Sequence, residues 1–225
     1  MNKKNTIIEC LCDISVEFES AESIIPIISR NSDFNDIKKL PVNQIPEVIR
    51  KSDPDLRKCP LYAIKSKNSQ SSILLGDYMI GIKTGDYTGW EYFLEEGKEI
   101  FESILNKQEI GKIERIGLRY INFFKEKDVF KTSQISLRIA NRGFEDGESD
   151  LRVVIKKPRE EIVCIMNIAN NQSIERKKGS VEKGSIIDII VAYENNNIPK
   201  DEVFDKINKL HDSYEQQLKN IVGEN

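Results

Sequence analysis

The chain has 225 residues, of which 39% are hydrophobic and 32% charged, and its 34 basic and 37 acidic side chains give a formal net charge of -3. This composition supports a folded core and argues against wholesale disorder, and the near-balanced charge gives no overall electrostatic footprint for DNA or RNA. No apolar run approaches the ~20 residues that a membrane helix needs, and the N-terminus lacks the continuous apolar stretch of a signal peptide. We therefore expect a cytoplasmic protein with no membrane contact.

Residues 6–18 alternate between apolar and polar side chains, which predicts a half-buried antiparallel strand. The apolar face of this strand carries Cys10 and Cys12, and none of the four cysteines forms a C-x-x-C pair. Buried, reduced thiols are therefore favoured over a metal or redox site. Residues 23–29 predict a short helix, and the proline-rich stretch 31–60 predicts an irregular crossing segment with one short helix.

The centre of the chain predicts a hairpin, a turn, a helix and a strand. Residues 61–67 and 71–84 are expected to form the hairpin, and the sequence GDYTGW is expected to form the turn. Thr88 stands three residues before Glu91, the spacing of a capping box, so a helix should begin here with Trp90 as its apolar anchor. Residues 112–124 then alternate as a strand with one apolar face.

The second part of the chain predicts several strands and one long helix. The expected strands are 133–140, 151–157, 161–169 and 185–193, and the helix runs from Pro199 to about residue 222. Because these strands follow one another without helices, the prediction is an α+β fold with a curved, largely antiparallel sheet of about seven to eight strands packed on two long helices. We expect a single domain, 1–225, that contains two related β-rich halves, 1–125 and 126–225, each ending in strand–turn–helix.

The chain has few candidate residues for catalysis or ligand binding. His211 is the only histidine, no phosphate-binding loop or GxGxxG motif is present, and so an enzyme, a metal site and a cofactor are all disfavoured. Arg115 and Arg119 share one face of a strand, where they could hold a phosphate or a carboxylate. The alternative, which we favour, is that each arginine pairs with a carboxylate on a neighbouring strand and fixes its register. The complete set of candidate ligand-binding residues is Arg115, Arg119, Tyr120, Asn122 and His211.

A second basic group lies in the stretch ERKKGSVEKG. It contains Arg176, Lys177, Lys178 and Lys183, which could contact nucleic acid or an acidic partner. The favoured alternative is a solubilising, mobile hairpin loop.

The central sequence LLGDYMIGI…GDYTGWEYF…KIERIGLRYINFF resembles a sporadically distributed family of uncharacterised prokaryotic proteins. The residues that carry the resemblance are Glu9, Leu75, Gly76, Tyr87, Trp90, Phe93, 115–122, Leu210 and His211. No activity is established for that family, and its patchy distribution implies carriage on mobile elements, in defence or toxin-linked modules.

These observations lead to three hypotheses about function. The first is a non-enzymatic binding or regulatory subunit of a multi-protein bacterial system, associated with anti-phage defence or a mobile element, whose protein partners come from the same operon. The second is a sensor of a small anionic, nucleotide-like ligand held by Arg115 and Arg119. The third is nucleic-acid binding through the basic 176–183 loop.

Overall fold

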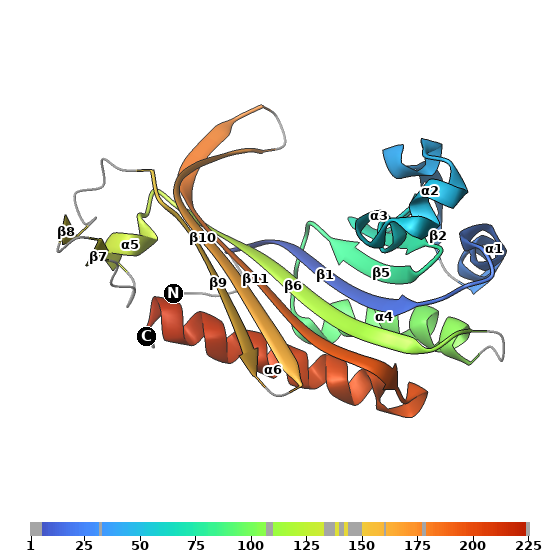
Figure 1. Cartoon of the computed structure of the whole chain (residues 1–225). Helices are drawn as coiled ribbons and strands as arrows, with labels where there is room; N and C mark the ends of the chain where they lie inside the picture. Colours follow the sequence, from blue (N-terminus) through green and yellow to red (C-terminus); the bar gives the residue numbers. More distant parts are fainter. Residues whose placement is uncertain are drawn as a thin grey trace.

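A computed structural model of the chain describes residues 6–31, 33–106, 110–132, 138–139, 142–143, 150–159, 161–176 and 179–223. Its main feature is one nine-stranded antiparallel sheet with the order β2-β3-β4-β5-β1-β6-β11-β10-β9 (Figure 1). The strands are β1 (Ile7–Val16), β2 (Phe34–Lys39), β3 (Tyr62–Ser66), β4 (Ser71–Gly76), β5 (Met79–Thr84), β6 (Ile113–Lys125), β9 (Arg152–Arg159), β10 (Ile162–Glu175) and β11 (Val181–Ile198). The predicted α+β class with a large antiparallel sheet is confirmed.

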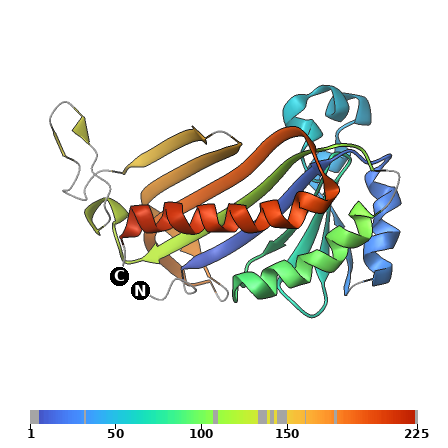
Figure 2. The same ribbon diagram turned by 90° about the horizontal axis from the view of Figure 1, so that it is seen from below.

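Helices lie on both faces of this sheet. α4 (Trp90–Leu105) and α6 (Val203–Val222) cross the same face, and α1 (Ala21–Asn31) lies beside α4 (Figure 2). The other face is partly covered by α2 (Glu47–Ser52) and α3 (Pro54–Arg57) (Figure 1). The remaining short elements are η2 (Pro41–Gln44), α5 (Val129–Thr132), β7 (Arg138–Ile139), β8 (Arg142–Gly143) and η3 (Lys200–Glu202). None of the helices in the described ranges is long and apolar enough to cross a membrane.

The core lies between the sheet and the α4–α6 layer. Because side chains alternate along a strand, β1 and β6 direct one apolar row each toward the helices. Cys10, Cys12 and Ile14 of β1 are at most 2% exposed, and Tyr120 of β6 is fully buried. The predicted burial of these two cysteines is confirmed, and burial raises the pKa of both thiols. They are therefore protonated, apolar packing groups.

Two strands were missed by the sequence analysis. The prediction for 71–84 was wrong because this run is not one strand but a second hairpin, β4 and β5, which turns at Asp77 and Tyr78. The stretch 31–60 is not wholly irregular, since it contains β2 and two short helices, α2 and α3. The sheet accordingly has nine strands where about seven to eight were expected. Most of the strand predicted at 133–140 lies outside the described residues.

The predicted capping box at the start of α4 is also wrong. The helix begins after Gly89, whose φ of 154° favours glycine, and no side chain caps it. The backbone N–H of Phe93 donates to the carbonyl oxygen of Gly89 at 3.1 Å, so Thr88 stands one residue too early to act as the cap. The glycine, and not the threonine, sets where this helix starts.

The two sides of the sheet have the same topology when each is followed outward from the central strands. β1 and β6 pair in the middle, and the orders β1-β5-β4-β3 and β6-β11-β10-β9 follow on the two sides, with α4 after β5 and α6 after β11. Two related halves would give this arrangement, which groups β6 with the second half although the predicted halves meet at residue 125. The connections differ: α1, β2, η2, α2 and α3 lie between β1 and β3, whereas the described elements between β6 and β9 are α5, β7 and β8.

Candidate functional site

Arg115 and Arg119 lie on the sheet face opposite to α4 and α6, and each is paired with a carboxylate. Arg119 makes a two-pronged contact with Asp188 of β11, through Nε–Oδ1 and Nη2–Oδ2 distances of 2.9 Å each. This contact raises the pKa of Arg119. Arg115 donates to Asp13 of β1. The guanidinium groups therefore link β6 to both neighbouring strands, the arrangement expected of register-fixing ion pairs.

Gly117 between the two arginines does not leave an open surface. A Cβ atom placed on Gly117 would lie 2.5 Å from the guanidinium nitrogens of Arg115. The Arg115 guanidinium therefore lies directly over the glycine, and a side chain at position 117 would require it to shift. Glycine at this position leaves room for Arg115 to reach Asp13.

Tyr120, Asn122 and His211 lie on the opposite, helix-covered face of the sheet, so the five candidate ligand-binding residues do not form one site. The Tyr120 hydroxyl and His211 Nδ1 are 3.0 Å apart and hydrogen-bonded, and the Tyr120 ring stacks on Tyr214 at 3.8 Å between centroids. The Tyr214 hydroxyl donates to Asn122 Oδ1 at 3.0 Å, and Asn122 Nδ2 donates to the Ile187 carbonyl oxygen at 3.3 Å. These contacts form a polar network inside the core.

His211 also joins the two helices. Its ring stacks on Trp90 of α4 at 4.2 Å with an interplanar angle of 7°, and Trp90 Nε1 donates to Asn208 Oδ1 at 3.1 Å. Desolvation lowers the pKa of His211, which outweighs the opposing influence of Glu215 and Asp212. The imidazole is therefore neutral at physiological pH and packs as an aromatic ring.

The basic 176–183 segment forms the tip of the β10–β11 hairpin, which is longer than predicted. The pairing continues through Gln172 with Gly184 to Glu175 with Val181, so the expected long loop is largely strand. Glu182 accepts from Arg176 Nε at 2.8 Å and from Lys125 Nζ at 3.0 Å. Lys183 is exposed, and Lys177 and Lys178 lie outside the described residues. Part of the basic charge is thus neutralised within the hairpin.

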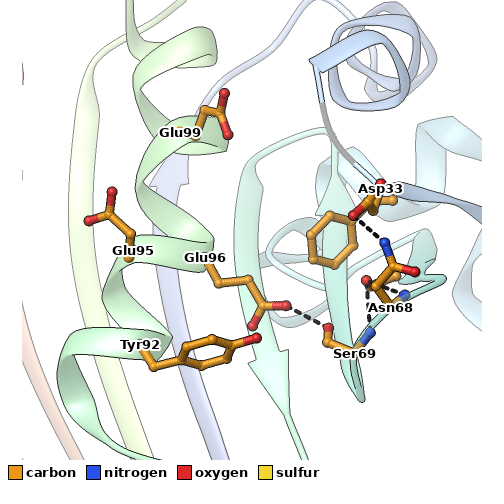
Figure 3. Close-up of a pocket in the computed structure, with 9 residues that line it drawn as sticks. Asp33, Asn68, Ser69, Tyr92, Glu95, Glu96 and Glu99 are labelled. Atoms are coloured by element: carbon orange, nitrogen blue, oxygen red, sulfur yellow. Dashed lines mark hydrogen bonds between the residues drawn. The ribbon is translucent and has the colours of Figure 1, made fainter.

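Two clefts lie beside the long helices. The first, here called the α4 cleft, has a volume of about 650 Å³. It is lined by Asp33, Phe34, Ser66, Asn68, Ser69, Tyr92, Glu95, Glu96 and Glu99 (Figure 3). Its central carboxylate, Glu96, accepts from Ser69 Oγ at 2.5 Å and from Ser71 Oγ at 2.6 Å. Asn68 Nδ2 donates to Asp33 at 2.5 Å. The buried polar groups of the α4 cleft therefore have partners within the protein.

The second cavity, the α6 cleft, lies between α6 and the start of β10 and has a volume of about 750 Å³. It is lined by Glu161, Ile162, Cys164, Tyr193, Lys209, Asp212, Ser213, Gln216 and Gln217. Gln217 and Tyr193 are only 3% and 5% exposed, yet neither side chain makes a hydrogen bond in the described part of the chain. The Lys206 ammonium lies 4.6 Å from the centre of the Tyr193 ring.

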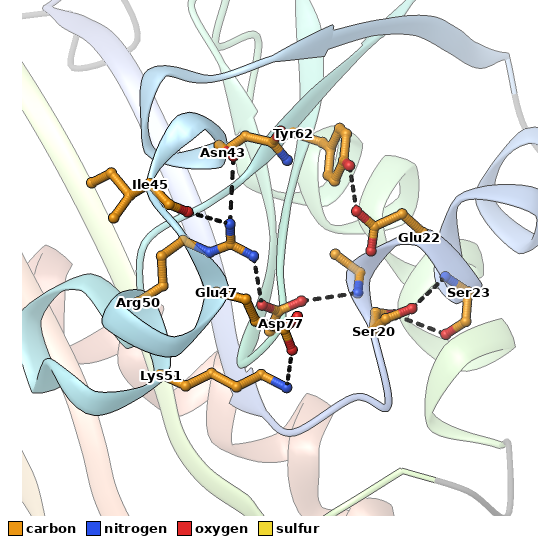
Figure 4. Close-up of polar contacts among 11 residues, drawn as sticks. Ser20, Glu22, Ser23, Asn43, Ile45, Glu47, Arg50, Lys51, Tyr62 and Asp77 are labelled. Atoms are coloured by element: carbon orange, nitrogen blue, oxygen red, sulfur yellow. Dashed lines mark hydrogen bonds and ion pairs between the residues drawn. The ribbon is translucent and has the colours of Figure 1, made fainter.

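A third polar group ties α1 and α2 to the turn between β4 and β5 (Figure 4). Arg50 of α2 pairs with Asp77 Oδ2 at 3.3 Å and donates to the Ile45 carbonyl oxygen at 2.8 Å. Asp77 Oδ1 accepts from the backbone N–H of Ala21, the first residue of α1, at 3.1 Å. Asp77 is 7% exposed, so this is a buried structural contact in the first half.

The α6 cleft was not predicted from the sequence, although one signal for it was present. Gln217 falls at a buried position of α6, beside the apolar stripe that contains Tyr214 and Leu218. A polar residue on the buried face of a helix needs an explanation, because burial of an amide is costly unless it is hydrogen-bonded. Tyr193 gave no such signal, since a tyrosine in a strand fits a half-buried surface.

Comparison with models of protein families, with curated proteins and with solved structures gives no match to this chain. The resemblance seen in the sequence therefore stays a prediction. Within the described ranges, no three His, Cys, Asp or Glu side chains are grouped so that they could hold a metal ion.

Proposed function

We propose that the chain is a non-enzymatic binding module of a multi-protein bacterial assembly, and that β9 pairs with an extended, acidic segment of a protein partner. The observation that supports the proposal is a difference in strand pairing between β3 and β9, which occupy corresponding positions in the two halves. In the first half β3 is covered by β2, whereas β9 has only β10 as a partner among the described strands. An uncovered strand edge presents unpaired backbone N–H and C=O groups, which a partner strand can use.

The side chains of β9 define the chemistry of the partner. Arg152, Val154 and Lys156 alternate along one face of the strand and are exposed, Val154 by 59%. This row offers two positive charges on either side of an apolar contact. A partner strand with acidic residues flanking an aliphatic residue would complement it through cross-strand pairs.

The other edge strand, β2, has a different character. Its exposed residues include Asp36, Ile37 and Lys38, so positive and negative charges are mixed. Its pairing with β3 is also irregular between Phe34 and Asp36. Mixed charge and irregular pairing are devices that protect an edge from further strand addition. We therefore assign the binding role to β9 and use β2 as the control.

The two alternative functions have less support. A site for an anionic ligand would need Arg115 and Arg119 to exchange Asp13 and Asp188 for that ligand. A nucleic-acid site would use a hairpin tip whose Arg176 is paired with Glu182. An association with anti-phage defence or mobile elements stays a prediction.

Site-specific photo-crosslinking tests the proposal. A benzophenone amino acid replaces Val154 on β9 or, as the matched control, Ile37 on β2, which is 45% exposed. In cells of the source organism we expect one dominant adduct from position 154 and none from position 37. Mass spectrometry should place the crosslink in an extended, acidic segment of the partner.

The purified partner segment then allows a quantitative test. We expect the double variant Arg152→Glu and Lys156→Glu to bind this peptide at least about tenfold more weakly, because like charges then face each other across the strand pair. Lys38→Glu on β2 should leave the affinity unchanged. The proposal is contradicted by equal adducts at both positions, by the lack of any adduct at position 154, or by unaltered affinity in the double variant.

A further inference from the structure

The α6 cleft is lined by two largely buried residues whose polar groups make no hydrogen bond with the described part of the chain. These residues are Gln217, which is 3% exposed, and Tyr193, which is 5% exposed. In the described part of the chain, Arg50 Nε is the one fully buried side-chain nitrogen or oxygen that lacks a partner. The amide and the phenol therefore keep contact with the cleft that both residues line. They are positioned to bind something that enters it.

Such an arrangement gives the folded protein less stability than apolar packing would give. The partial loss of water around an amide and a phenol is not offset by a protein hydrogen bond, whereas apolar groups of similar shape would carry no such cost. The α4 cleft shows the alternative, since Ser69 and Ser71 satisfy Glu96 there. Binding sites commonly carry this kind of cost, because groups kept ready for a ligand cannot also be used for packing.

The charges around the α6 cleft balance one another. Glu161 and Asp212 are acidic, Lys209 is basic, and Lys206 lies 4.0 Å from Glu161 and 3.4 Å from Glu202. Ile162 and Cys164 supply an apolar wall. A cleft with mixed charge at its rim and uncharged hydrogen-bonding groups inside favours a neutral ligand. Its volume of about 750 Å³ suits a small molecule.

The geometry points to the class of ligand. A glutamine carboxamide presents an acceptor oxygen and N–H donors side by side, and this edge is complementary to another amide edge. The tyrosine hydroxyl adds one further donor or acceptor. We propose that the α6 cleft binds a small, uncharged molecule with an amide-type edge, in which an N–H donor adjoins a carbonyl acceptor. This edge occurs in free carboxamides, in nucleobases and in the peptide amide of amino-acid derivatives. The proposal is independent of strand pairing at β9.

Isothermal titration of the full chain tests the proposal with one probe from each source: nicotinamide, uridine and N-acetyl-leucinamide. We expect at least one of them to bind the wild-type protein, and the probe that binds identifies the source. We expect 3-acetylpyridine, which resembles nicotinamide but lacks the N–H donors, not to bind. Gln217→Met and Tyr193→Phe should each weaken binding of the active probe about tenfold or more, since each removes a hydrogen bond but preserves shape.

Stability measurements separate a ligand-binding role from a structural one. The free Gln217→Met protein should have a thermal midpoint equal to or above that of the wild type, because no protein hydrogen bond is lost. Gln44→Met, at an exposed position of η2, is the control for both measurements and should change neither. The proposal is overturned if no probe binds the wild type, if 3-acetylpyridine binds as well as nicotinamide, if both cleft variants retain full affinity, or if Gln217→Met lowers the midpoint.

Discussion

The two clefts beside α4 and α6 occupy corresponding places in the strand order but treat their polar groups differently. In the α4 cleft, Glu96 and Asp33 accept hydrogen bonds from serine and asparagine side chains. In the α6 cleft, the buried groups of Gln217 and Tyr193 have no such partners among the described residues. The same difference extends to the sheet edges, where β2 covers β3 and no described strand covers β9.

This comparison indicates that two similar arrangements of strands use the polar groups in their clefts for different purposes. The polar groups of the α4 cleft are paired with one another and contribute to folding. Those of Gln217 and Tyr193 in the α6 cleft are left available, at a cost in stability that binding would offset. Substitutions should therefore have larger effects on folding in the first half than at corresponding places in the second.

The largest effect is expected at Asp77. Asp77→Ala removes the partner of Arg50 and the acceptor for the first N–H of α1. Breaking such a buried ion pair leaves an uncompensated charge, so the free energy of unfolding should fall by about 3 kcal/mol. Urea denaturation monitored by circular dichroism measures the change. Asp188→Ala is the control from the second half.

The control should cost less because its ion pair is more exposed. The Arg119 side chain that would lose its partner is 37% exposed, compared with 12% for Arg50. Water can therefore solvate the freed guanidinium of Arg119, and a loss of about 1 kcal/mol is expected. Equal losses in the two variants would show that the two halves do not differ in this respect.

The next largest effect concerns Trp90, which joins the halves through His211 and Asn208. Trp90→Ala removes the stacked ring and the indole hydrogen bond while leaving a partly exposed gap, which should cost about 2 kcal/mol. Tyr92→Ala, two residues along the same helix and 61% exposed, should change stability by less than about 0.5 kcal/mol. A Trp90 variant as stable as the Tyr92 variant would show that the contact between α4 and α6 is not stabilising.

These residues also show what could be predicted from sequence. Period-two alternation gave β1, β6 and β10, and three-and-four spacing gave α4 and α6, because burial on one face imposes those periods. The hairpin of β4 and β5 was missed because Gly76 and Asp77, a turn signal between two apolar runs, were taken as part of one long strand. Pairing between strands far apart in sequence, such as Arg119 with Asp188, depends on strand order, which a single sequence does not specify.

The α6 cleft was missed for a related reason. Gln217 on α6 and Tyr193 on β11 are brought together only when the helix folds back over the sheet. Spacing along the chain therefore could not connect them. The spacing of apolar residues in α6 marks Gln217 as a polar residue at a buried position, but its role depends on what lies opposite it in the fold.

A matched pair of serines tests the difference between the clefts. Ser71 is 2% exposed and donates to Glu96, so Ser71→Ala should cost about 1.5 kcal/mol, the usual value for a hydrogen bond to a charged group. Ser213 lines the α6 cleft and makes no hydrogen bond with the described residues, so Ser213→Ala should cost less than about 0.5 kcal/mol. Chemical denaturation of both variants measures the values. Similar losses would contradict the claim that only the α4 cleft is internally satisfied.

The smallest effect is a pH dependence at the contact between the halves. Burial lowers the pKa of His211 below its ordinary value of 6.5, so the folded protein binds this proton less readily than the unfolded chain. Below about pH 6.5 the unfolded chain takes up the proton first, and stability therefore falls as the pH decreases through that value and is restored above it. Protonation would place a charge between Trp90 and Tyr120, opposed only in part by Asp212 and Glu215. Urea midpoints between pH 7.5 and 5.5 should show this slope, and His211→Gln should reduce it, because His211 is the only histidine in the chain. An unchanged slope in the variant would assign the pH dependence to carboxylates and contradict the expected contribution of His211 protonation.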